Sequence, residues 1–391
     1  MHEVGVAMKL VGLFGRVVTD YEVWDDAAVL IGDGVIRDVS PDHALLDEAD
    51  EVHDYADCFL MPGFVDLQVN GGFGLDLATE PERAPELSEK LLSTGVTSYM
   101  PTLISSPESL YESALVGLSR AMVDTGFGAE ILGVHLEGPF ISLEKRGAHA
   151  ASYVRYPDPV LLGRLLDLGT VRMITLAPEL EGADEVSSLA ASRGVAVSAG
   201  HSNATFEEAY EAFDRRVGGV THLFNAMSPL RHRRPGLAGA AFAHPRVVCG
   251  VIADGLHIHP EMVGLSFRML GPDRIYLTTD STAATGMKAG KYSLATRTVY
   301  HDANMARLGS GAIAGSLLTM SEAFQNILAF TGCTIAEASR MSSTTPARLC
   351  GEGRRKGRLV TGYDADVTVL SPDLSVRAVW KGGGKVYQDQ R

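Results

Sequence analysis

The sequence predicts an α/β fold, a (β/α)8 TIM-like barrel beside a small β-sandwich domain built from both ends of the chain. Apolar, β-branched runs alternate with helical patterns through the middle of the chain, and short strand patterns fill both ends. Polar side chains follow several of the middle runs, at the strand ends where barrel enzymes carry their active sites. A doubly wound open sheet is the alternative, but no GxGxxG motif follows the first predicted strand of the middle segment.

The two ends of the chain consist of short strand patterns bounded by Asp, Gly or Pro. The N-terminal end contains "VGLFGRVVTD" and "DAAVLIGDGVIRDVS", and the C-terminal end contains "GRLVTGYDADVTVLS" and "VRAVWKGGGKVYQ". Neither end holds enough strands for a stable core by itself. We therefore predict that residues 1–57 and 356–391 pair into one β-sandwich domain, and that residues 58–355 form the catalytic barrel.

Alternating strand and helix patterns make up the predicted barrel. The predicted strands are residues 65–70, 97–103, 132–137, 171–176, 195–200, 219–222, 247–253 and 275–280. The predicted helices include residues 107–124, 205–216, 260–270 and 319–330, the first of which reads "PESLYESALVGLSRAMVD". Eight strands that alternate with helices over roughly 250 residues are typical of this barrel.

Composition and charge exclude several classes of protein. The chain has 391 residues, of which 46% are hydrophobic, and a formal net charge of -14. This charge argues against nucleic acid or an anionic membrane surface as a partner. The 4 cysteines are scattered without a CxxC pair, which disfavours both a disulfide framework and a thiolate zinc site. The first residues do not resemble a signal peptide, and no long apolar run is present, so we expect a soluble, cytoplasmic protein.

Polar side chains with chemical capacity end several predicted strands. They are Gln68, Glu137, His201, His222, Asp254 and Asp280. A single polar residue at a strand end is usually a turn former. Six of them at one end of a barrel favour an active site.

Three of these residues are candidate metal ligands. Glu137 lies in "GVHLEGPFIS", His201 in "SAGHSNAT" and His222 in "GVTHLFNAM". Each alone has a structural explanation, as a solvated turn carboxylate or as a buried histidine that satisfies a backbone group. Alternation places His135 on the same strand face as Glu137, and only one of the two is needed as a ligand. Together, two imidazoles and a carboxylate are a common ligand set for catalytic zinc.

Asp280 ends the eighth predicted strand, in "RIYLTTDST". A carboxylate beside a metal site can take a proton from water and return it to a leaving group. The alternative role is that of an N-cap for the following segment. Its place on the last strand favours catalysis.

A cationic group follows the second histidine. The segments "MSPLRHRRPG" and "ADGLHIHP" contribute Arg231, His232, Arg233, Arg234, His257 and His259. A solvated basic turn is the alternative, and we keep that interpretation for Arg231 and Arg234. Because guanidinium groups bind phosphate in a bidentate manner, at least one of the others could hold an anionic substrate.

Eight motifs together resemble one known family. In chain order they are "PGFVDLQVNGG", "HLEGPF", "KRGAH", "GHSNAT", "THLFNAMSP", "RRPGLAG", "ADGLHIHP" and "LTTDS". They resemble the N-acetylglucosamine-6-phosphate deacetylases of the amidohydrolase superfamily, over nearly the whole chain. The resemblance implies metal-dependent hydrolysis of N-acetyl-D-glucosamine 6-phosphate to D-glucosamine 6-phosphate and acetate. It also implies a metal-bearing barrel beside a β-sandwich made from both termini.

The resemblance implies a role for each matching residue in the reaction centre. Glu137, His201 and His222 would bind one divalent ion per subunit, with zinc expected and Fe, Co, Mn or Cd as alternatives. Asp280 would act as the general base and then as the general acid. His149, in "KRGAH", would hydrogen-bond to the acetamide carbonyl and polarise it.

The resemblance also implies a phosphate site. Asn225 and the backbone amide of Ala226 would bind the phosphate group. Arg233 and His257 would complete this site by reaching across from a neighbouring subunit. We therefore expect a homodimer that binds a small sugar phosphate as its substrate.

Gln68 and Asn70 occupy the positions where many amidohydrolases have His-x-His, which holds one of two metals. Amide side chains are weak zinc ligands compared with imidazole. The resemblance therefore implies a branch that works with one metal, in which Gln68 and Asn70 mark a vacant or weak second-metal position. No carboxylated bridging lysine is needed, because Glu137 takes a ligand role.

Two other functions compete with this interpretation. The first is an amidohydrolase that acts on a related substrate, such as N-acetylgalactosamine 6-phosphate or another N-acyl group. The second is a metal-poor homologue that serves as a binding or scaffold protein. A scaffold has no physical reason to keep the three metal ligands together with Asp280.

Overall fold

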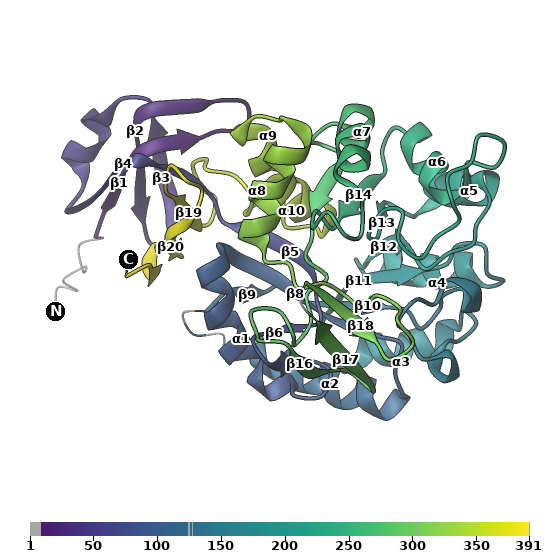
Figure 1. Ribbon diagram of the computed structural model, residues 1–391. Helices are drawn as coiled ribbons and strands as arrows, with labels where there is room; N and C mark the ends of the chain where they lie inside the picture. The colour runs from purple at the N-terminus through teal and green to yellow at the C-terminus, as the bar shows by residue number, and fades with distance from the viewer. Residues whose placement is uncertain (1–8, 124–125, 127, 303, 391) are drawn as a thin grey trace.

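The computed structural model describes residues 9–123, 126, 128–302 and 304–390. It contains a parallel barrel, a sheet formed by both ends of the chain and a three-stranded insert (Figure 1). In Figure 1 the purple N-terminal strands and the yellow C-terminal strands lie side by side at the left of the barrel. Residues 1–8 of the predicted sandwich, Asp124 of a predicted helix and Arg391 lie outside the described residues.

Parallel strands form the barrel, and their spatial order follows the chain. Within the described residues they are β5 (Phe64–Val69), β8 (Val96–Ile104), β10 (Val134–Glu137), β11 (Val171–Leu176), β12 (Ala196–Ala199), β13 (Gly219–Val220), β14 (Val248–Val251) and β15 (Ile275–Leu277). The short β9 (Glu130–Ile131) pairs with β8 outside this order. Each of the eight predicted strands overlaps one of these barrel strands. This strand order confirms the predicted barrel. The strands could be predicted because parallel strands are buried on both faces and consist largely of apolar and β-branched residues.

Helices cover the outside of the barrel. They are α1 (Ala84–Leu91), α2 (Glu108–Ala121), α3 (Pro159–Leu168), α4 (Ala183–Ser192), α5 (Phe206–Arg215), α6 (Gly236–Ala243), α7 (Pro260–Leu270), α8 (Met320–Thr331), α9 (Ile335–Ser339) and α10 (Thr345–Leu349). The predicted helices correspond to α2, α5, α7 and α8. Reciprocal capping by Thr205 with Glu208, and by Thr319 with Glu322, defines where α5 and α8 begin.

The first and last barrel strands meet through side chains and one backbone contact. The Asn70 amide donates to the Ser281 carbonyl at 2.9 Å. One carboxylate oxygen of Asp66, Oδ1, accepts from Thr278 Oγ1 at 2.7 Å, and Oδ2 accepts from Thr279 Oγ1 at 2.5 Å. Burial raises the pKa of Asp66 to about 6, against the effect of these hydrogen bonds. Asp66 therefore closes the barrel directly beneath the strand ends that carry the predicted site.

Both ends of the chain form one continuous sheet, in the order β21-β20-β19-β4-β1-β2-β3. Its strands are β1 (Val11–Val18), β2 (Val23–Gly32), β3 (Val35–Ser40), β4 (Glu51–Pro62), β19 (Val367–Leu370), β20 (Val376–Lys381) and β21 (Gly384–Gln388). β4 is central because it pairs with β1 on one side and with β19 on the other. The β1–β4 register shifts after Gly15, where a Cβ atom would lie 2.9 Å from the Tyr55 carbonyl oxygen.

The predicted β-sandwich is thus a single sheet whose two halves share one apolar core. This core includes Leu13, Val29 and Ile36 from the N-terminal strands and Val367, Ala378 and Trp380 from the C-terminal strands. β4 continues past residue 57, the predicted domain boundary, because residues 59–62 pair with β19. The division into domains remains a prediction.

Two small antiparallel units, neither predicted from the sequence, lie beside the barrel mouth. A hairpin is formed by β6 (Gly71–Gly72) and β7 (Leu75–Asp76), and an insert by β16 (Gly290–Leu294), β17 (Arg297–Asp302) and β18 (Met305–Leu308). The Ala295 amide donates to Asp76 Oδ2 at 2.6 Å. This buried contact fastens the insert to the hairpin.

A buried cluster of charges joins the barrel to the terminal sheet. Lys356 Nζ lies 2.8 Å from Glu130 Oε2, 3.0 Å from Asp364 Oδ2 and 2.6 Å from Asp366 Oδ2. Its side chain is only 2% exposed. Arg355 adds a contact of 2.6 Å to Glu130 Oε1. Burial alone would raise the pKa of Glu130, but Arg355 and Lys356 outweigh this effect and lower it to about 2.

We expect Lys356→Met to lower the free energy of unfolding by about 3–5 kcal/mol at pH 7, because it leaves the buried Asp366 carboxylate without its cation. Since the pKa of Glu130 is lowered, its stabilising contribution is complete above its unfolded pKa of about 4.3. That contribution is lost as pH falls towards its folded pKa of about 2. The difference between wild type and variant should therefore narrow between these two pH values. Urea unfolding at pH 7 and at pH 3 measures both effects.

The matched control is Arg354→Met, which removes an exposed cation two positions away. Surface substitutions of this kind usually change stability by less than about 0.5 kcal/mol. Equal losses in the two variants would contradict a specific role for Lys356.

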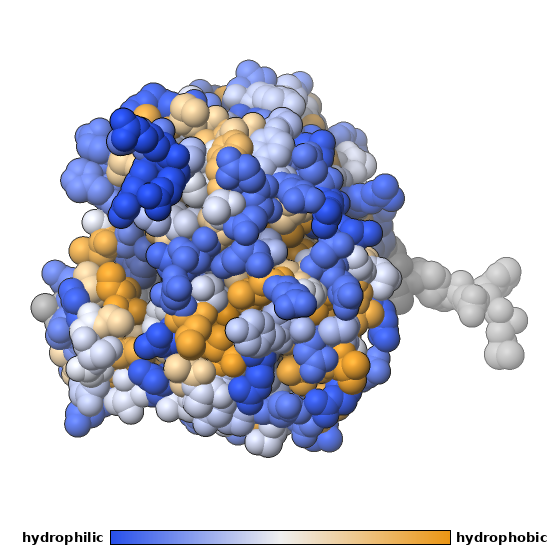
Figure 2. Space-filling view, turned by 90° about the vertical axis from the view of Figure 1, so that its right-hand side faces the viewer, coloured by the Kyte–Doolittle hydropathy of each residue, from blue (hydrophilic) through white to orange (hydrophobic). Residues whose placement is uncertain are grey.

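The outer surface of the barrel helices is mainly polar. Figure 2 looks at the face that carries α4, α5 and α6, where hydrophilic side chains predominate and apolar ones gather in the lower half. None of the helices in the described part of the chain combines the length and the apolar composition needed to cross a membrane. These helices turn their apolar sides towards the barrel.

Candidate active site and metal centre

A cavity of about 380 Å³ opens at the C-terminal ends of the barrel strands. Most of the predicted site residues line it, namely Asn70, Glu137, His149, His201, His222, Asn225, Ala226, His257 and Asp280. Gln68 is buried directly behind the cavity, where it contacts two of its carboxylates. Arg233 lies on the exposed surface of its own chain. The structure therefore brings all but one of the predicted residues together.

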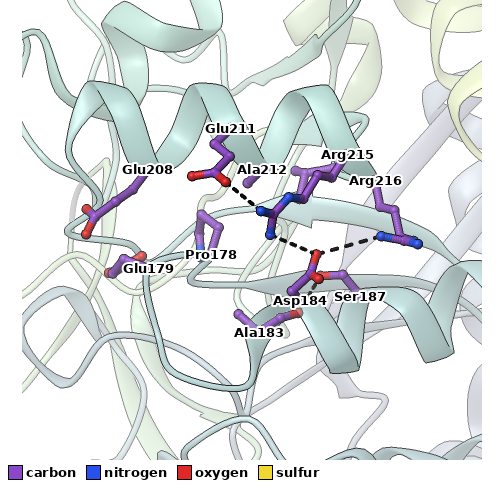
Figure 3. A pocket seen from close by; sticks show the side chains of 11 residues that line it. Pro178, Glu179, Ala183, Asp184, Ser187, Glu208, Glu211, Ala212, Arg215 and Arg216 are labelled. Carbon is purple, nitrogen blue, oxygen red and sulfur yellow. Dashed lines mark hydrogen bonds and ion pairs between the residues drawn. The ribbon is translucent and has the colours of Figure 1, made fainter.

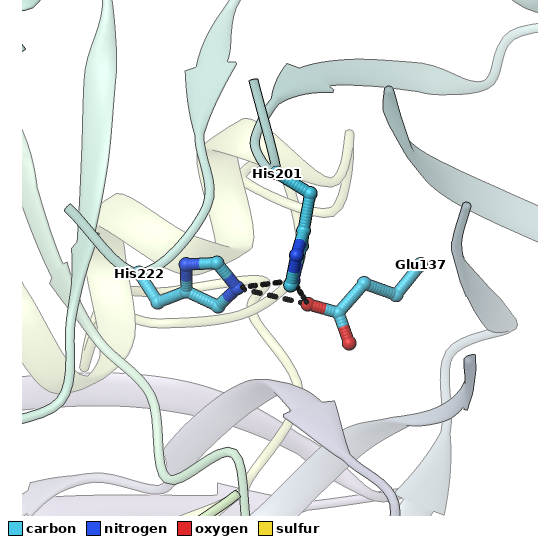
Figure 4. Close-up of side chains that lie close together, drawn as sticks. All are labelled: Glu137, His201 and His222. Atoms are coloured by element: carbon cyan, nitrogen blue, oxygen red, sulfur yellow. Dashed lines mark hydrogen bonds and ion pairs between the residues drawn. The ribbon is translucent and has the colours of Figure 1, made fainter. Parts of the chain in front are cut away.

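The three predicted metal ligands point toward one another (Figure 4). Glu137 Oε1 lies 3.1 Å from His201 Nε2 and 2.9 Å from His222 Nε2, and the two nitrogens are 3.1 Å apart. All three side chains are buried. Within the described residues, they are the one group of three or more ligating side chains close enough to hold an ion.

The donor atoms of this cluster fit a divalent cation. His201 Nδ1 donates to the Lys145 carbonyl at 2.8 Å, so the lone pair of Nε2 faces the cluster. Tetrahedral zinc with Zn–N distances of about 2.0–2.1 Å holds its ligands about 3.3 Å apart, close to the observed spacing. Burial alone would raise the pKa of Glu137. The three neighbouring imidazoles of His149, His201 and His222 outweigh the effect of burial and hold that pKa well below its usual value.

Strained backbone turns aim these side chains into the cavity. His201, His222 and Asp280 each follow a barrel strand, with φ values of 48°, 34° and 50°. A non-glycine residue in this left-handed region costs about 1–3 kcal/mol and persists only where its surroundings hold it. The polar strand ends were predicted, but this conformation was not. It ends each strand and turns the side chain toward the barrel axis.

Asp280 is held by the two amides at the predicted vacant metal position. Asn70 Nδ2 donates to Asp280 Oδ1 at 2.8 Å, and Gln68 Nε2 donates to the same oxygen at 3.2 Å. Gln68 Nε2 also donates to Glu137 Oε1 at 2.9 Å. Burial and the charge of Glu137 raise the pKa of Asp280 to about 8 in the absence of metal. Both amides thus present N–H groups, which cannot ligate a metal, to the carboxylates.

His149 is fixed in one tautomer by a residue that the sequence did not single out. Its Nδ1 accepts from the Ser105 backbone amide at 3.1 Å and from Ser105 Oγ at 2.8 Å. A backbone amide can only donate, so Nδ1 carries no proton and Nε2 carries it. Nε2 lies 3.8 Å from Glu137 Oε2. His149 therefore directs an N–H group at the reaction centre.

His135, the other candidate on the Glu137 strand face, serves the barrel interior. Its Nδ1 donates to the Leu67 carbonyl at 2.9 Å, and its Nε2 accepts from Thr175 Oγ1 at 2.7 Å. The chain of hydroxyls continues through Thr221 to Ser198, with 2.7 Å at each step. Burial lowers the pKa of His135 to about 4. Both nitrogens are thus occupied, and His135 supports the strands beneath the ligands.

Three of the four predicted phosphate-binding residues line the cavity, and the fourth, Arg233, lies on the exposed surface. Asn225 and Ala226 line the cavity near His222. His257 lines the cavity of its own chain, which differs from the cross-subunit position expected for it. The cause is Asp254, whose Oδ1 accepts from the His257 amide at 2.8 Å and whose Oδ2 accepts from its Nδ1 at 2.6 Å. This turn after β14 folds the ring back toward the barrel mouth.

Comparison with known proteins identifies the family. A family model described as "Amidohydrolase family" matches residues 59–386. The chain belongs to the amidohydrolase family. This amidohydrolase is 38% identical to the N-acetylglucosamine-6-phosphate deacetylase of Bos taurus over 371 residues, or 90% of each chain. It is also 35% identical to the N-acetylgalactosamine-6-phosphate deacetylase of Escherichia coli O157:H7, which covers 94% of this chain and 97% of that one.

Solved amidohydrolase structures confirm the fold. A mutant N-acetyl-D-glucosamine-6-phosphate deacetylase from Mycobacterium smegmatis, in complex with N-acetyl-D-glucosamine-6-phosphate, has a TM-score of 0.90 and 32% identity. The comparison covers 97% of this chain and 100% of that one. Amidohydrolases are metal-dependent enzymes, and the cluster of Glu137, His201 and His222 is a candidate site for the ion.

Proposed function

We propose that this amidohydrolase converts N-acetyl-D-glucosamine 6-phosphate to D-glucosamine 6-phosphate and acetate. The observation that carries the proposal is one cavity that combines the metal-ligand cluster, a buried carboxylate, an N–H donor and the predicted phosphate residues. The bovine relative carries the name of this activity, and the mycobacterial relative was solved with this sugar phosphate bound. The match over nearly the whole chain supports the same substrate here.

Glu137, His201 and His222 would hold one divalent ion, for which zinc is our first choice and Fe, Co, Mn and Cd are alternatives. When bound, the ion would supply positive charge that acidifies water and polarises the acetamide oxygen. Gln68 and Asn70 donate hydrogen bonds to the neighbouring carboxylates, which supports a vacant or weak second-metal position.

The remaining residues of the centre move protons and stabilise charge. Asp280 takes a proton from the water that attacks the acetyl carbon, and the N–H of His149 stabilises the negative oxygen that develops. The amide C–N bond then breaks. Asp280 returns the proton to the sugar nitrogen, and acetate leaves with the oxygen of the water.

Because the chain as a whole is acidic, binding of the substrate phosphate needs hydrogen-bond donors and positive groups gathered at one place. Asn225 and the Ala226 amide are proposed to bind the phosphate, with His257 from the same chain in the same cavity wall. Arg233 is exposed on its own chain, which supports its proposed contribution to the cavity of a neighbouring subunit in a homodimer.

The test of the proposed function is acetate release from a panel of N-acetylhexosamine 6-phosphates, with and without a chelator. We expect the glucosamine derivative to have the highest kcat/KM and the chelator to remove the activity. The relative named for N-acetylgalactosamine 6-phosphate makes that epimer the second candidate. A higher kcat/KM for the galactosamine derivative would replace the first substrate with the second. No acetate from any member would exclude both.

We expect elemental analysis of the purified protein to find about one tightly bound divalent ion per chain. The reason is that the amides of Gln68 and Asn70 replace the imidazoles that a second ion would need. Replacing His222 with alanine should remove most of this ion, because two ligands of the cluster remain. Two stoichiometric ions in the wild type would contradict the interpretation of Gln68 and Asn70.

A further inference from the structure

Glu179 lies outside the active-site cavity, in the loop that follows β11. It lines a separate pocket of about 150 Å³ between α4 and α5 (Figure 3). In Figure 3 it lies beside Glu208, away from the group in which Asp184 contacts Arg215 and Arg216. No function proposed above uses this carboxylate.

Both carboxylate oxygens of Glu179 hold the turn that carries a metal ligand. Oε2 accepts from Ser202 Oγ at 2.7 Å, and Oε1 accepts from the Asn203 backbone amide at 2.6 Å. These two residues directly follow His201, whose left-handed φ of 48° needs support from its surroundings. Burial raises the pKa of Glu179, against the effect of these hydrogen bonds.

The same turn is paired with the segment that carries the proposed phosphate site. The Ser202 amide donates to the Ala226 carbonyl at 3.1 Å, and the Ser228 amide donates to the Ser202 carbonyl at 2.9 Å. Ala226 itself has a left-handed φ of 47°. Ser202 therefore lies between Glu179 on one side and Ala226 on the other.

We propose that Glu179 is a positioning residue that holds the His201 turn in register with the Ala226 turn, and so couples metal binding to recognition of the substrate phosphate. This inference rests on the proposed function, which assigns the two turns to metal and phosphate. Glu179 acts through Ser202 and Asn203, because it is not among the described residues that line the active-site cavity.

Glu179→Ala removes both acceptors and tests the coupling. We expect zinc affinity, measured by competition with a chromophoric chelator, to fall about 10- to 100-fold, the usual cost of losing a partner that orients a metal ligand. The KM for N-acetyl-D-glucosamine 6-phosphate should rise about tenfold or more. The kcat at saturating zinc and substrate should change less. The kcat/KM for unphosphorylated N-acetyl-D-glucosamine should also change less, because no phosphate is bound.

Three further variants separate this role from general destabilisation. Glu179→Gln keeps the shape and one acceptor, so its effects should be intermediate, and it serves if the alanine variant does not fold. Glu211→Gln is the matched control, because Glu211 lines the same pocket but contacts Arg215 at 2.5 Å on the surface. Combining Ser202→Ala with Glu179→Ala should cost less than the sum of the single losses, since the two residues act through one contact.

The coupling is wrong if either zinc affinity or the KM for the phosphorylated sugar matches that of Glu211→Gln. Additive losses in the double variant would also overturn it. Failure of the proposed function has a different signature, since the wild type would then release no acetate from the phosphorylated sugar. In that case the zinc affinity of Glu179→Ala still tests whether Glu179 supports the His201 turn, because this measurement needs no substrate.

Discussion

Replacing Asp280 with asparagine is expected to abolish measurable deacetylation while the bound metal remains. One proton-transfer role is typically worth about 10²–10⁴-fold in rate, and Asp280 is proposed to serve twice, as base and as acid. We therefore expect a loss in kcat at the upper end of this range. Asparagine cannot take up a proton at neutral pH, although it fills the same space.

The contacts of Asp280 explain why this substitution should leave folding and metal binding unchanged. Asn70 and Gln68 both donate to Oδ1, and the carbonyl oxygen of an asparagine can still accept both hydrogen bonds. Asp280 is not one of the three clustered ligands. Metal content and melting temperature should therefore stay close to those of the wild type.

Steady-state acetate release and elemental analysis of the same protein sample measure the two parts of this prediction. Glu144→Gln is the control, since it neutralises another carboxylate in the cavity wall that has no proposed role. Turnover within tenfold of the wild type in the asparagine variant would remove Asp280 from the mechanism. A large loss in the control would show that the rate responds to the total charge of the cavity.

The barrel could be predicted from the sequence because its strands are buried on both faces. The run at residues 247–253, for example, consists of apolar residues and one glycine and is followed by Asp254. The clustering of Glu137, His201 and His222 could be predicted because the three residues end three different strands of one barrel. Periodicity and position thus determined which side chains meet.

Three other features of the site and fold could not be predicted from periodicity, each for its own physical reason. Ser105 and His149 are 44 positions apart, and only the folded loops bring the amide of one to the ring of the other. The insert of β16–β18 carries short, half-exposed strands with little apolar alternation. The inward turn of His257 depends on the local hydrogen bonds of Asp254, and no periodicity predicts such a turn.

Replacing His149 with alanine is expected to lower kcat about 10²–10³-fold, which corresponds to about 2.7–4 kcal/mol of transition-state stabilisation. The ring is 3% exposed and points its Nε2–H into the cavity, because Ser105 occupies Nδ1. A donor that acts on charge developing in the transition state contributes to kcat more than to substrate binding. KM should therefore change little.

The contact with Ser105 supplies the control for this prediction. Ser105→Ala removes the hydroxyl, but the backbone amide still donates to Nδ1 and keeps the proton on Nε2. Its loss in kcat should therefore be much smaller than that of His149→Ala. The loss for His149→Gln should fall between the two, because a glutamine amide can still donate a hydrogen bond.

Nitrogen-15 NMR of labelled histidine reports which ring nitrogen of His149 carries the proton. A proton on Nδ1 in the wild type would contradict this orientation, and unchanged kcat in His149→Ala would remove the ring from the stabilisation of the oxyanion.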